Sequence, residues 1–131
     1  MTMDRGDAYR RKLSVILEEL ASVPDDLADL SPLEVRGVLH AVQVAIHAAV
    51  DIAAMKVKDL GEEVGDDFHN LMVLVERKVI TAQMGDGLRR LNGLRNAIVH
   101  RYKRFEEEAV LDGIAEIRDI LYGYVEALGG A

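Results

Sequence analysis

The sequence predicts an all-α fold, an up-and-down bundle of about five helices that forms a single domain over residues 1–131. Apolar residues recur at intervals of three and four along almost the whole chain, which is the spacing of amphipathic helices. No segment alternates apolar and polar residues in the way that a half-buried strand would. Half of the residues are hydrophobic, and a chain of this length can bury most of its apolar surface in one core.

The first helix is predicted by four apolar residues at positions i, i+3, i+4 and i+7: Leu13, Ile16, Leu17 and Leu20. A second, much longer helix begins where Ser31 can act as the N-cap, Pro32 takes the first helical position and Glu34 completes a capping box. The apolar spacing continues to Leu60, and Gly61 is a natural stop. At ~1.5 Å per residue this helix is roughly 40 Å long.

The long helix is apolar on two sides, with a narrow polar stripe between them. One apolar face consists of Val35, Val38, Leu39, Val42, Ile46, Ala49, Val50, Ala53, Val57 and Leu60, and the second of Ala41, Val44, Ala45, Ala48, Ile52 and Met55. The polar stripe consists of His40, Gln43, His47 and Asp51. Because two apolar sides predict burial on two sides, we expect one of them to meet another subunit in a homodimer. The alternative is a central bundle helix with a solvated polar stripe.

Three more helical segments follow. The third is predicted by an apolar face of Phe68, Leu71, Met72, Val75 and Val79. Thr81 can cap the fourth, whose first turn is weakened by Gly85 and Gly87 and whose pattern is strong from Leu88 to about Lys103. The last helix is predicted by Val110, Ile114, Ile117, Leu121, Tyr124 and Leu128.

The fourth helix interrupts its apolar stripe with a charge. Leu88, Leu91, Arg95, Ile98 and Tyr102 share this stripe, and Asn92, Asn96 and His100 form a polar stripe beside it. A guanidinium on a core-facing stripe needs a partner or a cleft, because burying an unpaired charge is costly. An internal ion pair for Arg95 and a helix-capping role for His100 are the structural alternatives to a functional site.

Charge is distributed unevenly along the chain. The chain has 16 basic and 23 acidic residues, a net charge of −7, which argues against a nonspecific nucleic-acid binder. Residues 87–105, however, contain six basic residues and no acidic one, so the remaining chain carries −13. This segment is a candidate anion-binding face; a basic surface that pairs with acidic loops of the same protein is the alternative.

These residue types suit the cleavage of RNA without a metal or another cofactor. A histidine can exchange protons near neutral pH, and an arginine can hold two phosphate oxygens and stabilise a phosphorane-like transition state. The 2′-hydroxyl would be the nucleophile. Since Arg95 and His100 are five residues apart, about 140° around an ideal helix, a second copy across a two-fold axis could complete a shared cleft. His47 and Asp51 could line the cleft, and as two ligands alone they are weak evidence for a metal site.

The sequence excludes several other classes. The absence of cysteine excludes disulfides, thiolate nucleophiles and cysteine-ligated metals. No secretory signal is found, because Glu18 and Glu19 interrupt the apolar run after the first basic residues. The low-charge stretch of residues 41–55 is too short and too polar to span a bilayer. We therefore expect a cytoplasmic protein with no membrane contact.

The segment from Arg95 to Tyr102 reads RNAIVHRY and resembles the R-x4-H-x-Y signature of the HepT-like branch of the HEPN superfamily. Residues 43–53 resemble the long second helix of that family, although His47 stands where glutamate is more common. The resemblance runs from about Asp7 to Leu128, nearly the whole chain. Its specificity comes from the motif on the fourth helix of an all-α chain of this length.

The resemblance implies a homodimeric HEPN-like bundle that acts as the endoribonuclease toxin of a type II toxin–antitoxin pair. Arg95 and His100 would be catalytic, and Asn96 would support the site. The partner would be a minimal nucleotidyltransferase antitoxin, which could neutralise the toxin by transferring AMP to Tyr102. One alternative is a non-catalytic HEPN module that binds a nucleotidyltransferase and helps present its substrate, and another is a purely structural dimeric bundle.

Overall fold

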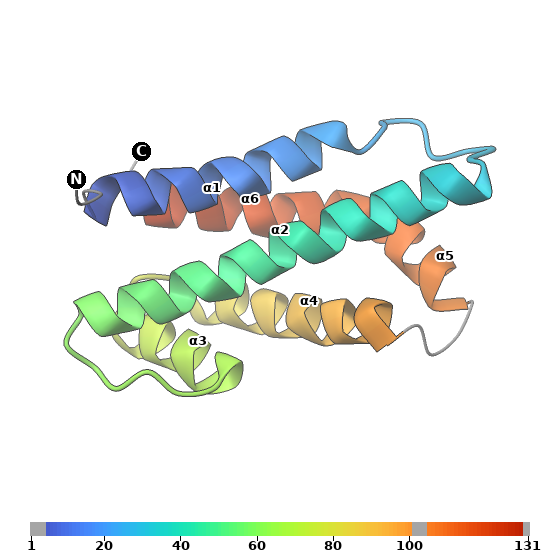
Figure 1. The fold of residues 1–131 in the computed structure, drawn as a ribbon. Helices are drawn as coiled ribbons and strands as arrows, with labels where there is room; N and C mark the ends of the chain where they lie inside the picture. Colours follow the sequence, from blue (N-terminus) through green and yellow to red (C-terminus); the bar gives the residue numbers. More distant parts are fainter. Residues whose placement is uncertain (1–4, 101–104, 130–131) are drawn as a thin grey trace.

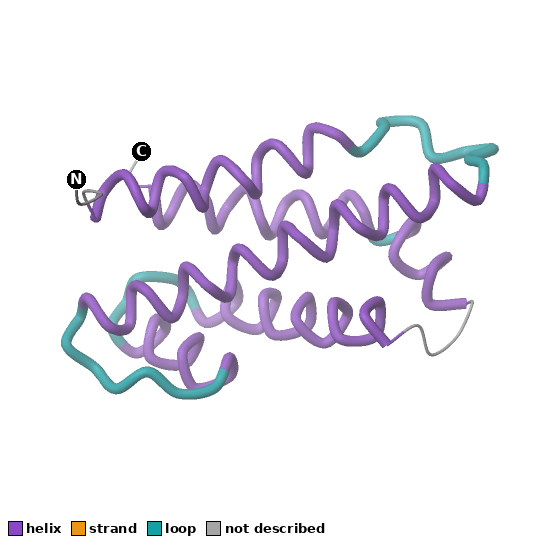
Figure 2. The backbone as a smooth tube through the Cα atoms, viewed as in Figure 1, coloured by secondary structure: helices purple, strands orange, loops and turns teal. Residues whose placement is uncertain are grey.

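The computed structural model describes residues 5–100 and 105–129. Within these ranges every regular element is an α-helix, and there are six (Figure 1; Figure 2). They are α1 (Arg5–Ser22), α2 (Pro32–Asp59), α3 (Asp67–Glu76), α4 (Ala82–His100), α5 (Phe105–Asp112) and α6 (Ile114–Gly129). The all-α fold class predicted from the sequence is confirmed.

Helix α2 is the centre of the bundle. It contacts each of the other helices, with α1 and α6 on one side and α3 and α4 on the other (Figure 1). Both of its ends follow the predicted signals. The side chain of Ser31 accepts from the Glu34 amide, the Glu34 carboxylate accepts from the Ser31 amide, and Gly61 has a φ of 77° after the C-cap Leu60.

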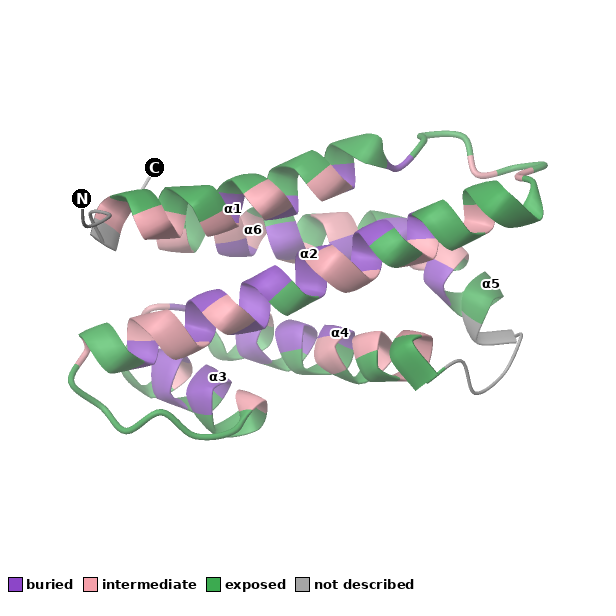
Figure 3. Ribbon diagram, viewed as in Figure 1, coloured by how far each residue is buried: buried purple, intermediate pink, exposed green. Residues whose placement is uncertain are grey.

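The second apolar face of α2 corrects one prediction. We expected another subunit to cover it, but Ala41, Ala45, Ala48 and Ile52 are already buried by the helices of the same chain. The buried residues form a band that winds around the middle of α2 (Figure 3). A central helix in a six-helix bundle has neighbours on several sides, so its two apolar faces are no argument for a dimer.

By length and composition alone, α2 could also cross a membrane. Its most apolar window has a mean hydropathy of 1.6, but 56% of that window is buried inside the bundle. A core helix of a helical bundle passes the same test. Residues 41–55, the low-charge stretch considered from the sequence, are only part of this helix.

The last predicted helix is two helices, which raises the predicted number from about five to six within the described ranges. The amide of Gly113 donates to the carbonyls of Ala109 and Val110 and ends α5, and its own carbonyl accepts from the Ile117 amide in the first turn of α6. The chain changes direction here without losing its apolar stripe. Val110, Ile114 and Ile117 are all buried.

The predicted face of α3 is confirmed in part: Leu71 is buried, and Val75 and Val79 pack against the core. Phe68 and Met72 remain 49% and 41% exposed, whereas Asn70 and Leu74 are buried. Asn70 can be buried because its side chain bonds both the amide and the carbonyl of Gly65, so neither polar group loses its partner. The exposed apolar residues of α3 instead line a pocket against α4.

Candidate functional site

Helix α4, which carries the candidate site, has two unlike halves. The Thr81 hydroxyl accepts from the Met84 amide and caps its first turn, as predicted. The buried residues of α4 are Gly85, Gly87, Leu88 and Leu91. From residue 92 to residue 100 no residue is fully buried. The half that holds Arg95, Asn96 and His100 therefore presents much of its surface to solvent or to another molecule.

Arg95 is half-buried and held by two side chains. Its Nη1 lies 2.7 Å from Nδ1 of His47 on α2, and its Nη2 donates to Oδ1 of Asn96 at 3.1 Å. A guanidinium can only donate, so Nδ1 of His47 must be the acceptor and the imidazole proton must lie on Nε2. Among the described residues the buried Nε of Arg95 has no hydrogen-bond partner. The charge is thus fixed in place without a carboxylate partner in the described part of the chain.

The polar stripe of α2 continues this network. Nε2 of His47 lies 3.5 Å from Oδ2 of Asp51, and the same oxygen accepts from Nζ of Lys12 on α1 at 3.0 Å. His47 and Asp51 therefore lie beside Arg95, and their role as cleft-lining residues stays a prediction. Lys12 was missed, because nothing in the local pattern of α1 links it to α2.

His100 and Asn96 are both exposed, and His100 is the last residue of α4. Asn96 is brought directly to Arg95 by its hydrogen bond, whereas His100 stands at the end of the helix. Tyr102, the predicted modification site, lies outside the described residues. The structure thus brings Arg95, Asn96, His47 and Asp51 together and places His100 on the same helix.

Asn92 does not belong to this cluster, although the sequence placed it on one stripe with Asn96 and His100. Its amide nitrogen donates to Oδ2 of Asp67, the first residue of α3, at 3.0 Å. This contact joins α4 to α3. The helical register predicted the stripe, but the contact with α3 separates Asn92 from the group around Arg95.

The basic face of α4 is partly used by internal contacts. Arg90 forms an ion pair with Glu116 of α6 at 2.8 Å, and the guanidinium of Arg89 lies over the ring of Phe68, 4.6 Å from its centroid. Three of the six basic residues in the segment lie at positions 101, 103 and 104, outside the described residues. The alternative of pairing within the protein is therefore realised at Arg90, whereas Arg95 has no acidic partner in the ranges that the structure describes.

His47 and Asp51 alone do not make a metal centre. In the part of the chain that the structure describes, no group of three or more His, Asp or Glu side chains is placed to hold a metal ion. Asp51 is engaged by Lys12, and Nδ1 of His47 is engaged by Arg95. Both side chains act here as parts of a hydrogen-bonded support for the arginine.

Solved structures show the same fold. A tri-AMPylated HEPN toxin of Shewanella oneidensis in complex with MNT antitoxin aligns with a TM-score of 0.86 and 17% identity over 98% of this chain and 100% of that chain. A toxin–antitoxin structure with AMP-PNP aligns with a TM-score of 0.85 and 17% identity, covering 96% of this chain and 99% of that one. YutE of Bacillus subtilis, a cytosolic protein of unknown function, aligns with a TM-score of 0.83 and 17% identity over 98% of this chain and 90% of that one.

Relatives found by sequence are more similar to this chain than these solved structures are. Two proteins of Archaeoglobus fulgidus, each named "Putative RNase", are 38% identical over 122 residues and 40% identical over 116 residues. The first match covers 93% of this chain and 91% of the relative, and the second covers 88% and 87%. The family described as "Ribonuclease HepT-like" matches residues 25–128, which include the whole of α2 and α4. The chain therefore belongs to the HepT-like ribonuclease family and has the fold of the HEPN toxins.

Proposed function

We propose that this protein is the endoribonuclease toxin of a type II toxin–antitoxin pair and cuts RNA with Arg95 and His100 in a cleft between two copies of the chain. The observation that carries the proposal is the set of contacts made by the Arg95 guanidinium. Its guanidinium is fixed by His47 and Asn96, has no carboxylate partner among the described residues, and stands five positions before a histidine on the same helix. Family membership supports the same class of activity.

The chemistry follows from the two side chains. The 2′-hydroxyl oxygen of RNA attacks the adjacent phosphorus while His100 takes the hydroxyl proton as general base. The bond from the 2′-oxygen to phosphorus forms, the bond to the 5′-oxygen breaks, and the 5′-oxygen receives a proton from His100 of the second copy, which acts as general acid. Arg95 donates to the phosphoryl oxygens, where negative charge accumulates in the transition state. The scheme uses no protein nucleophile and no cofactor, and its first product is a cyclic phosphodiester.

A second copy would complete the site. A general base and a general acid are both needed, and one His100 cannot stand on both sides of the scissile bond. The half of α4 that holds the motif has no fully buried residue, and Val99 beside His100 is 47% exposed. This surface is available for a two-fold contact that brings a second Arg95 and His100 to the same cleft. A homodimer remains part of the proposal, as does a cytoplasmic location.

The partner we propose is a minimal nucleotidyltransferase antitoxin. The support is that proteins of the same fold have been solved in complex with MNT antitoxin, one of them as a tri-AMPylated toxin. We propose that this partner transfers AMP from ATP to the hydroxyl of Tyr102, releasing pyrophosphate. An anionic adduct two residues beyond His100 would repel a phosphate from the cleft.

RNA cleavage tests the enzyme. Wild-type chain, Arg95→Ala and His100→Ala are compared on labelled single-stranded RNA and by growth after induced expression. Wild type should cut and arrest growth, and both variants should lose at least a hundredfold in rate. Equal activity in all three would overturn the catalytic assignment, and a monomer by light scattering at micromolar concentration would overturn the shared cleft.

Modification is tested separately. Intact mass is measured after incubation of the toxin with the nucleotidyltransferase and ATP. One or more AMP-sized increases are expected for the wild type and should be absent from Tyr102→Phe. An increase that is unchanged in Tyr102→Phe would place the modification elsewhere.

A second candidate function is a non-catalytic module that binds a nucleotidyltransferase and helps present its substrate; the complexes of same-fold proteins with an antitoxin support the binding part of this candidate. In that case Arg95 would hold a phosphate without cleaving RNA. This candidate predicts co-purification with the nucleotidyltransferase, no RNA cleavage by any variant, and weaker partner activity when Arg95 is replaced by alanine.

A further inference from the structure

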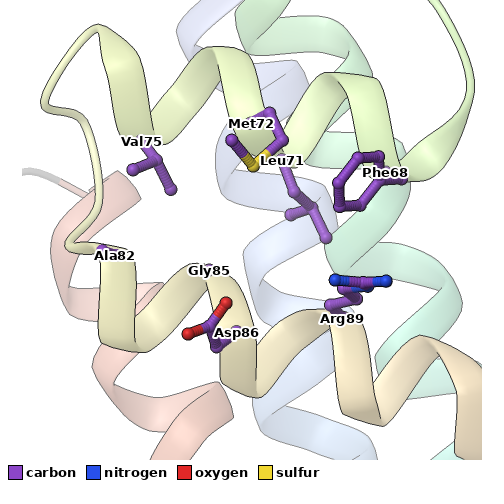
Figure 4. A pocket seen from close by; sticks show the side chains of 8 residues that line it. All are labelled: Phe68, Leu71, Met72, Val75, Ala82, Gly85, Asp86 and Arg89. Carbon is purple, nitrogen blue, oxygen red and sulfur yellow. The ribbon is translucent and has the colours of Figure 1, made fainter.

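A small apolar pocket lies between α3 and α4, apart from the cluster around Arg95. It holds a volume of about 130 Å³ and is lined by Phe68, Leu71, Met72, Val75, Ala82, Gly85, Asp86 and Arg89. Figure 4 shows four side chains from α3 facing the backbone of Gly85 and the side chains of Asp86 and Arg89 on α4. The proposed ribonuclease chemistry uses none of these residues.

The size and lining of the pocket fit one planar ring. A cavity of about 150 Å³ lined by apolar side chains can hold a benzene molecule, so this pocket has room for a ring of similar size. At one end of the pocket α3 and α4 approach closely, and only a glycine fits at position 85, because a Cβ there would lie 2.6 Å from Cγ2 of Val75. Phe68 and Met72 stay 49% and 41% exposed at its edge, a state that favours a ligand with an apolar face.

The charged residues of the pocket fit a nucleotide. The guanidinium of Arg89 lies over the Phe68 ring, 4.6 Å from its centroid, so an aromatic ring and a planar cation occur together at the edge of the pocket. Proteins that bind single-stranded RNA stack unpaired bases on aromatic rings and arginine planes and hydrogen-bond their edges. Asp86 can accept from the amino group of cytosine, whereas it would repel the O4 oxygen that uracil carries at the same place.

Arg89, at the edge of the pocket, and His100 lie on the same side of α4. Arg89 and His100 are eleven positions apart on α4. An ideal helix therefore places His100 within about 20° of the side that carries Arg89, roughly 16 Å further along the axis. Gly93 and Asn96 lie on the same side, and both are exposed. A Cβ at Gly93 would meet nothing within 4 Å, so the surface is open at this position. A single strand could follow α4 from one to the other.

We infer that this pocket binds a pyrimidine base of the RNA strand, a few nucleotides from the scissile bond, and that Asp86 makes it prefer cytosine over uracil. The inference rests on the proposed function, since it takes RNA as the substrate. It adds a site for base recognition to a cluster that by itself handles only the phosphate.

Binding is measured with short oligocytidylate and oligouridylate strands that carry 2′-O-methyl groups, because these strands cannot be cut by an internal 2′-hydroxyl. The wild type should bind oligocytidylate about tenfold tighter than oligouridylate. Asp86→Asn should bring the two affinities within about twofold, because an amide can donate or accept. Phe68→Ala should weaken both by about tenfold through lost stacking. Tyr122→Ala and Asp119→Asn, both at exposed positions of α6, are the matched controls and should bind as wild type.

The outcomes separate this inference from the proposed function. RNA cleavage that depends on Arg95 and His100, with oligonucleotide binding indifferent to Phe68 and Asp86, would overturn the pocket and leave the ribonuclease. Binding that depends on Phe68 and Asp86, with no cleavage by the wild type, would support the pocket and overturn the ribonuclease. A Phe68→Ala protein that changes from dimer to monomer with unchanged affinity would make the pocket an interface between copies and overturn the base site.

Discussion

His47 on α2 and Arg95 on α4 are joined by a 2.7 Å hydrogen bond from Nη1 to Nδ1, across 48 positions of the chain. This contact requires the lone pair of Nδ1 and therefore a neutral imidazole. It fixes a guanidinium whose Nε has no partner among the described residues. The arrangement positions a cation for an anionic ligand, and no carboxylate of residues 5–100 or 107–129 pairs with it.

Replacing Arg95 should remove activity without unfolding the protein. Arg95→Ala should lower kcat/KM for RNA by about 10²–10³, the usual cost of losing one group that stabilises developing charge. Arg95→Lys should recover only part of it, because an ammonium cannot bind two phosphate oxygens in a fixed fork. Cleavage rates measured alongside circular dichroism and thermal melting check this. A loss of activity that parallels a loss of folding would contradict the catalytic role.

His47 should act as a positioning residue for Arg95. His47→Ala leaves the guanidinium without its α2 partner, so we expect kcat to fall by about tenfold while KM changes little. His47→Gln should restore much of the loss, because the amide oxygen can accept from Nη1. Steady-state kinetics of the three proteins check the prediction. Equal losses in His47→Ala and His47→Gln would mean that the imidazole itself takes part in the chemistry.

Two glycines of α4 should respond oppositely to alanine. At Gly85 the added Cβ would lie 2.6 Å from Cγ2 of Val75, and the forced shift should cost about 1–3 kcal/mol of folding free energy. At Gly93 the added Cβ meets nothing within 4 Å, so Gly93→Ala should stabilise the helix by up to ~1 kcal/mol. Urea unfolding of both variants gives the comparison. Similar midpoints for the two would refute the close approach of α3 and α4.

Tyr124 should make folding sensitive to alkali. Its ring is fully buried, its hydroxyl donates to the Ala49 carbonyl at 2.8 Å, and burial raises the pKa of this phenol far above its usual value. Since the folded state keeps the proton that the unfolded chain loses near pH 10, stability is complete below that pH and falls above it.

Tyr124→Phe should therefore cost about 1 kcal/mol at neutral pH and flatten the alkaline decline. Melting temperatures from pH 7 to pH 11 measure both effects. The exposed Tyr122 on the same helix provides the control substitution, Tyr122→Phe, which should follow the wild-type curve. A Tyr124→Phe curve parallel to the wild type would show that another group causes the alkaline decline.

Local chemistry made α2 predictable from the sequence. The N-cap Ser31, the capping-box Glu34 and the stop at Gly61 depend only on residues a few positions away in the chain. The structure has all three as predicted. The site was partly predictable for the same reason. Arg95 and Asn96 lie on one helix, so their proximity follows from helical register.

The contacts between helices were not predictable in this way. Phe68 and Met72 have the spacing of a core face but line a pocket, while Asn70 is buried by its bonds to Gly65. The second apolar face of α2 is covered by other helices of this chain. The sequence does not show this, because it depends on how the six described helices pack together. Gly113 could have signalled the break between α5 and α6, since glycine weakens a helix interior.

By itself, the sequence determined the all-α class, the extent of the long helix, the family motif from Arg95 to Tyr102 and the uneven distribution of charge. These depend on periodicity and on neighbours in the chain. Only the tertiary structure decided three contacts between helices. Arg95 forms a hydrogen bond with His47, Asp51 forms an ion pair with Lys12, and the guanidinium of Arg89 lies over the ring of Phe68. Contacts between residues on different helices depend on how the whole core packs, because the packing fixes which face each helix turns toward its neighbours.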